Sequence, residues 1–65
     1  MKLGIIFKKE FQWKYGNKQE FYGDEITIRR DCLGQLYIKT LTKGNSEMIN
    51  FRVETIQLIY LGEWK

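Results

Sequence analysis

The sequence contains no histidine, no proline and no alanine, and its only cysteine is Cys32. Without an imidazole the chain cannot build a Ser–His or Cys–His nucleophile pair, and it has no histidine to act as a general base. One cysteine without histidine also excludes the common structural and catalytic zinc sites. These absences predict a protein that is not an enzyme, and we expect no metal and no other cofactor.

Motifs that bind nucleotide phosphates are missing as well, because neither G-x-G-x-x-G nor G-x-x-x-x-G-K-[ST] occurs. The carboxylates Asp24 and Glu25 are adjacent, but strand neighbours point to opposite faces, so they are poor partners for acid–base chemistry. Cys32 follows Arg29 and Arg30, but no base or second cysteine accompanies it. We therefore expect a buried or inert thiol.

Long hydrophobic runs are also missing. The longest apolar stretches are Leu3 to Phe7 and Leu58 to Leu61. A spanning helix needs about 20 apolar residues, and a signal peptide needs an apolar core of roughly 7–15 residues with a small-residue cleavage site. Small secreted domains usually carry several disulfides, which one cysteine cannot form. We therefore predict a cytoplasmic protein without a membrane partner.

The residues that are present favour strands. The 65 residues fit one domain, covering 1–65, and its content of Leu, Ile, Val and Phe is too high for a disordered chain. Abundant β-branched and aromatic residues favour strands over helices. Many Lys, Ile, Glu and Asn residues without Ala or Pro suggest an AT-rich coding sequence, which is typical of low-GC bacteria, their phages and mobile elements.

Six glycines separate short runs that favour strands, over residues 3–8, 10–15, 19–22, 25–30, 35–42, 47–53 and 58–61. This spacing predicts a mostly β fold: a five- to six-stranded antiparallel meander, or a small barrel of the SH3-like or Sm-like kind. Gly16-Asn17 predicts a two-residue hairpin turn within residues 10–22. Residues 53–61 allow two interpretations. One is a short 3₁₀ turn near residues 54–56 before a last strand, and the other is a helix, which the lack of caps disfavours.

A meander with the shortest loops predicts a register for the three central strands, with a four-residue turn at 43–46. On the apolar face, Ile38 lies opposite Ile28 and Phe51, Leu36 opposite Val53, and Thr40 opposite Ile26 and Ile49. On the other face, Arg29, Tyr37 and Arg52 form one row, Thr27, Lys39 and Asn50 form the next, and Leu41 pairs with Met48.

The polar face is the candidate nucleic-acid surface. Its residues are Arg29, Tyr37, Lys39 and Arg52. Bases stack on aromatic rings with about 1–3 kcal/mol per base, and guanidinium groups pair with phosphates. The alternative interpretation is an ordinary solvated face, in which the arginine stems cover the ring of Tyr37.

Aromatic residues of the predicted first hairpin form the candidate protein interface: Phe11, Trp13, Tyr15, Phe21 and Tyr22. Exposed aromatic patches mark interfaces, although these side chains would equally serve to close the end of a barrel.

The net charge is +3, and its excess lies in residues 1–30. Domains built for nucleic acid usually carry a stronger basic footprint. We therefore favour a non-catalytic protein-interaction module, such as an accessory protein of a phage or mobile element, over a small nucleic-acid-binding barrel. A homo-oligomer is compatible with both functions, because the edge strands of so small a sheet need covering.

Overall fold

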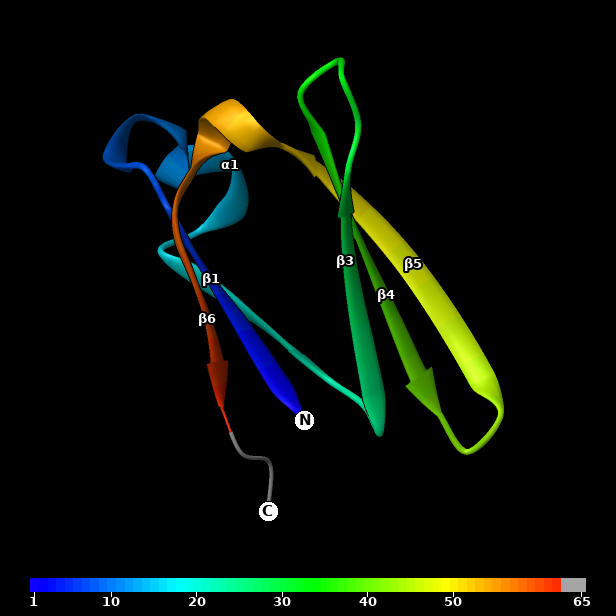
Figure 1. The fold of residues 1–65 in the computed structure, drawn as a ribbon. Coiled ribbons are helices and arrows are strands. Elements are labelled where there is room, and N and C mark those ends of the chain that lie inside the picture. Colours follow the sequence, from blue (N-terminus) through cyan, green and yellow to red (C-terminus); the bar gives the residue numbers. More distant parts are fainter. Residues whose placement is uncertain (63–65) are drawn as a thin grey trace.

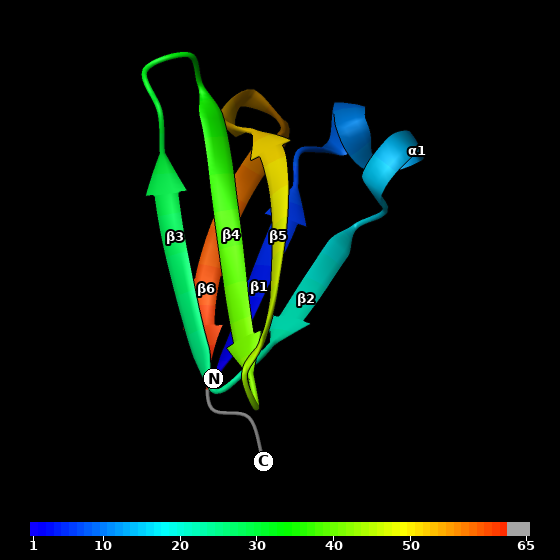
Figure 2. The same cartoon turned by 90° about the vertical axis from the view of Figure 1, so that its right-hand side faces the viewer.

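The computed structural model describes residues 1–62, which form two three-stranded antiparallel sheets that face each other (Figures 1 and 2). The strands are β1 (Lys2–Phe7), β2 (Lys18–Tyr22), β3 (Glu25–Arg30), β4 (Gln35–Thr42), β5 (Asn45–Arg52) and β6 (Ile56–Gly62). One sheet has the order β2-β1-β6 and the other β3-β4-β5. The prediction of a small, mostly β, antiparallel fold is confirmed, and the two sheets do not close into a barrel.

Strand β1 is the centre of the first sheet because its inner face is entirely apolar. Leu3, Ile5 and Phe7 alternate toward the second sheet and are fully buried. Leu36 and Ile38 of β4 and Phe51 of β5 complete this core from the other side. Pairing of β1 with β6 brings the first and last strands side by side (Figure 1).

The chain passes from β5 to β6 through a 3₁₀ turn, η2 (Val53–Thr55). Thr55 is buried there, and its hydroxyl donates a hydrogen bond of 2.7 Å to the carbonyl of Arg52. The predicted turn is therefore confirmed one residue earlier than expected. Because residues 56–62 form a strand, the helical alternative for this segment is wrong.

Residues 9–15 are helical, so the predicted strand and hairpin turn in this segment are wrong. A 3₁₀ turn, η1 (Lys9–Phe11), continues into the single-turn helix α1 (Gln12–Tyr15), which ends at Gly16 with a positive φ of 82°. The helical turn directs Tyr15 inward, where its ring stacks on Phe7 at a centroid distance of 4.8 Å and meets Phe51 edge-on at 5.7 Å. This aromatic contact gives the helical turn a tertiary anchor that the sequence pattern did not reveal.

The register of β3 with β4 is confirmed, but the predicted register of β4 with β5 is wrong by two residues. The turn contains only Lys43 and Gly44, with φ of 49° and 84°, so Thr42 pairs with Asn45. Positive φ at both central residues is the geometry of a type I′ hairpin, which fits the twist of paired strands. Side chains lie on the predicted faces of the sheet, but the residues directly opposite each other differ from the prediction. The observed pairs are Leu36 with Phe51, Ile38 with Ile49, Thr40 with Glu47, Gln35 with Arg52, Tyr37 with Asn50, Lys39 with Met48, and Leu41 with Ser46.

The loop between β3 and β4 is organised by one carboxylate. Asp31 Oδ1 accepts the backbone N–H groups of Leu33 and Gln35, both at 2.9 Å, and Oδ2 accepts the hydroxyl of Tyr37 at 3.2 Å. Cys32 is exposed at the tip of this loop, so of the two expected states, buried or inert, the buried one is wrong.

Candidate interaction surfaces

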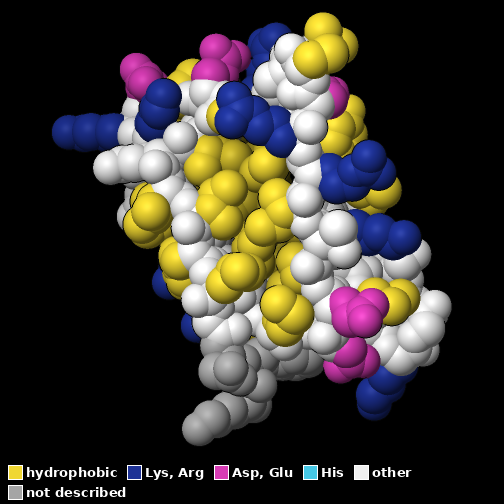
Figure 3. Space-filling view, in the orientation of Figure 1, with side chains coloured by type: hydrophobic (Ala, Val, Ile, Leu, Met, Phe, Trp, Pro, Cys, Tyr) yellow, Lys and Arg dark blue, Asp and Glu magenta, His cyan; other side chains and the backbone are white. Residues whose placement is uncertain are grey.

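The side of the molecule between β3 and β6 is open. Within residues 1–62, β3 pairs only with β4 and β6 pairs only with β1, so each strand has one unpaired edge. Their inner faces carry Ile28 and Leu61, which are 38% and 60% exposed, and the half-buried Ile26 and Ile59. Figure 3 views this side, and hydrophobic side chains fill the space between the two strands. The core is therefore accessible here between two free strand edges.

The backbone groups on the outer edge of β3 can be assigned from one hydrogen bond. The N–H of Asp31 donates to the carbonyl of Gln35 at 3.0 Å. Because the direction of backbone groups alternates along a strand, odd-numbered residues of β3 bond toward β4. Ile26, Ile28 and Arg30 consequently direct their N–H and C=O groups away from the sheet, where a further strand can reach them.

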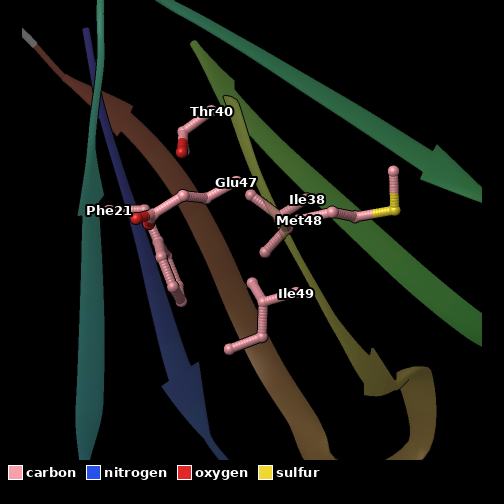
Figure 4. A pocket seen from close by; sticks show the side chains of 6 residues that line it. All are labelled: Phe21, Ile38, Thr40, Glu47, Met48 and Ile49. Carbon is pink, nitrogen blue, oxygen red and sulfur yellow. The ribbon is translucent and has the colours of Figure 1, made fainter. Parts of the chain in front are cut away.

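A cleft opens on the opposite side, between β2 and β5 (Figure 4). Its volume is about 430 Å³, and it is lined by Phe21, Ile38, Thr40, Glu47, Met48 and Ile49. In Figure 4 the Glu47 carboxylate lies beside the ring of Phe21, while Met48 projects away from the other side chains. The lining of this cleft is mainly apolar, with Thr40 and the Glu47 carboxylate as its polar members.

The candidate nucleic-acid residues are only partly brought together. Arg29 and Tyr37 are opposite each other, and Lys39 lies two residues along β4 on the same face. Arg52 is displaced from this row because it pairs with Gln35, and its guanidinium instead lies 3.6 Å from the Glu54 carboxylate. The candidate nucleic-acid surface therefore lacks its second arginine.

A smaller cleft of about 270 Å³ adjoins this face, lined by Arg29, Arg30, Asp31, Tyr37 and Met48. The backbone N–H of Gln35, together with hydrogen bonds from Leu33 and Tyr37, lowers the pKa of Asp31. The hydrogen bond to Asp31 in turn raises the pKa of Tyr37. The carboxylate of Asp31 is thus ionised at neutral pH, and its charge opposes the entry of a phosphate.

The candidate protein-interface aromatics do not form one surface. Tyr15 and Phe21 both turn inward against Phe51, at centroid distances of 5.7 and 6.1 Å. Trp13 is 82% exposed on α1, and Tyr22 is exposed at the far end of β2. Phe11 is half-buried. Since the hairpin that would have aligned the five residues is absent, the only prominent aromatic protrusion among them is Trp13.

The residues that border the open side were not singled out from the sequence. Ile28 and Leu61 read as ordinary core positions in an alternating pattern, and Glu25 reads as a solvated charge. Their exposure follows from the sheet order, which leaves β3 and β6 at the borders. The sequence does show acidic residues before Ile28 and basic residues after it. This order of charges indicates an interaction surface only if the strand lies at the edge of its sheet.

In the described part of the chain no group of His, Cys, Asp and Glu side chains is arranged to hold a metal ion, and no helix has the length and apolarity needed to cross a membrane. The surfaces described above are consequently the basis for any functional assignment. No protein-family model, no curated protein and no solved structure matches the chain.

Proposed function

We propose that this chain is a non-catalytic protein-interaction module whose β3–β6 side accepts an extended strand of a partner protein. The observation that carries the proposal is the exposure of Ile28 and Leu61 between two strand edges that have no partner within residues 1–62. Addition of a strand to a free sheet edge combines backbone hydrogen bonds with pockets for alternate side chains. An accessory protein of a phage or mobile element would act in this way, by docking onto another protein.

Covering this side of the molecule would be energetically favourable. Complete burial of an Ile or Leu side chain contributes about 1.5–3 kcal/mol, so covering the exposed parts of Ile28 and Leu61 recovers a fraction of that for each. An added strand would also satisfy the outward backbone groups of Ile26 and Ile28. A free apolar edge of this kind is otherwise a site of uncontrolled association, which supports a dedicated partner.

Site-specific photocrosslinking tests the proposal in the cells that natively encode the chain. A photoreactive p-benzoylphenylalanine side chain is placed at Ile28, and a matched control carries it at Lys39, which is exposed on the outer face of β4. We expect position 28 to yield discrete protein adducts that position 39 does not. Loss of adducts at position 28, or the same adducts from both positions, would contradict the proposed function.

A second candidate function, nucleic-acid binding, is favoured by one observation: Arg29, Arg30 and Tyr37 line the same 270 Å³ cleft. If the interaction module is correct, fluorescence titration with short single- and double-stranded DNA and RNA should show no binding tighter than about 10 μM at low salt. Arg29→Ala should then change nothing. Micromolar or tighter binding that weakens about tenfold or more over a few-fold rise in salt would instead assign this face to nucleic acid.

A further inference from the structure

The edge strand β3 and the residue before it have a self-complementary order of charges. The segment reads Asp24-Glu25-Ile26-Thr27-Ile28-Arg29-Arg30, with acidic residues at its start, basic residues at its end and Thr27 at its centre. When such a strand runs antiparallel to an identical strand, its acidic end lies beside the basic end of the other. The strand that best fits this edge is therefore a copy of itself.

We propose that the partner strand is β3 of a second copy of this chain, paired antiparallel with Thr27 opposite Thr27. The inference rests on the proposed function, since it names the partner that occupies the same side. In this register Glu25 lies opposite Arg29 of the second copy on the outer face. Ile26 lies opposite Ile28 of the second copy on the inner face, continuing the apolar surface between β3 and β6.

Other registers lose this complementarity. Directly opposite residues of two paired strands lie on the same face, so the pairing can shift only in steps that preserve the faces. A shift in one direction places Glu25 opposite Asp31, and a shift in the other places Arg29 opposite Gly23. The Thr27-centred register is the one that pairs opposite charges and apolar residues together.

The backbone of β3 is arranged for the same register. Ile26 and Ile28 direct their N–H and C=O groups away from β4, so each Ile26 can exchange both backbone hydrogen bonds with Ile28 of the second copy. The two Thr27 residues then form a non-hydrogen-bonded pair, in which side chains approach most closely. The result is one continuous sheet in the order β5-β4-β3-β3-β4-β5, generated by a two-fold axis through the Thr27 pair.

The charges needed for the interface are available. Glu25, Arg29 and Arg30 are exposed, and none of them forms an ion pair or a side-chain hydrogen bond among the residues that the structure describes. The ion pairs are elsewhere: Lys2–Glu20, Lys18–Glu20 and Arg52–Glu54. Asp24 already accepts the backbone N–H of Lys43 at 3.2 Å, so Glu25 with Arg29 is the pair that decides the association.

Charge reversal combined with analytical ultracentrifugation tests the inference. Glu25→Arg and Arg29→Glu each replace two opposite-charge pairs with two like-charge pairs, and we expect each to weaken dimerisation at least about tenfold. The double variant carrying both changes restores both pairs and keeps the wild-type net charge. Its affinity should return to within about threefold of wild type, and an equimolar mixture of the single variants should form a mixed dimer tighter than either alone.

Circular dichroism checks that each variant keeps an intact β fold. We expect that it does, because the changed side chains lie on the surface. A wild-type chain that is monomeric at about 1 mM overturns the inference, because association weaker than this is negligible. Single reversals without effect, or a double reversal that restores nothing, overturn it equally.

Disulfide trapping provides a measurement that does not depend on charge. In a Cys32→Ser background, Thr27→Cys should form a covalent dimer under mild oxidation, because opposite residues of a non-hydrogen-bonded pair approach the separation that a disulfide requires. Lys39→Cys in the same background is the matched control. Equal trapping at both positions would overturn the register.

The failure of this inference can be distinguished from the failure of the proposed function. A monomeric chain that still crosslinks to other proteins at position 28 would overturn only the inference that the partner is a second copy. The absence of any crosslinks would overturn the proposed function too.

Discussion

Replacement of Phe7 by alanine is expected to lower the free energy of unfolding by about 3–5 kcal/mol, the largest loss that we predict for any single change in this chain. The Phe7 side chain is fully buried, stacks on Tyr15 at an interplanar angle of 15° and meets Phe51 edge-on at 5.3 Å. Removing a buried phenylalanine side chain costs about 3–5 kcal/mol. A domain of this length has a free energy of unfolding of about 3–10 kcal/mol in total, so the substitution would remove a large part of the stability.

Circular dichroism during urea and thermal denaturation measures this effect. The matched control is Trp13→Ala, which removes a larger aromatic side chain from a position that is 82% exposed. We expect that change to alter the free energy of unfolding by at most about 0.5 kcal/mol. Unfolding of the Phe7→Ala variant at the wild-type midpoint, or an equally severe effect of Trp13→Ala, would show that the aromatic cluster is not the centre of stability.

The structure of residues 9–15 could not be predicted from the alternation of apolar and polar residues. Phe11, Trp13 and Tyr15 are spaced by two, as in a strand, but Phe11 and Tyr15 are also spaced by four, as on one face of a helix. The same residues therefore fit both a strand and a helix. The choice depends on the stacking of Tyr15 against Phe7, a tertiary contact that the local sequence does not contain.

The regular strands were predictable because alternation specifies which side chains face the core. Residues 25–30 and 35–42 were predicted with their observed bounds and register. The register of β5 was not, since a shift by two residues leaves every face unchanged and alternation cannot distinguish the two arrangements. A two-residue turn requires a positive φ at Lys43, and lysine gives no sequence signal for that conformation.

This ambiguity had a direct consequence for the candidate sites. A two-residue shift moves a side chain along its strand by roughly 7 Å, which is enough to separate Arg52 from Tyr37. Sheet order had the larger effect, because it decides which strands are edges. The charge order around Thr27 was visible in the sequence, but it describes an interface only once β3 is known to lack a neighbour on one side.

Gly4 is the position at which a small change should give the next largest effect on stability. It lies at the centre of β1, opposite Tyr60 of β6, and the Tyr60 ring covers it so closely that an added Cβ would overlap the ring. Gly4→Ala therefore forces the ring off the sheet, and we expect a loss of about 1–3 kcal/mol. The close approach of Tyr60 is the structural reason for a glycine in the middle of this central strand.

A double-mutant cycle with Tyr60→Ala separates this overlap from the backbone preference of glycine. Without the Tyr60 ring the three atoms nearest to the new methyl group are removed, and alanine is favoured over glycine inside a strand by about 0.5–1 kcal/mol. The same Gly4→Ala change should therefore destabilise the wild-type protein and stabilise the Tyr60→Ala variant, as measured by urea denaturation. Additive effects of the two changes would mean that the ring does not depend on Gly4, because only residues in contact produce a coupling energy of this size.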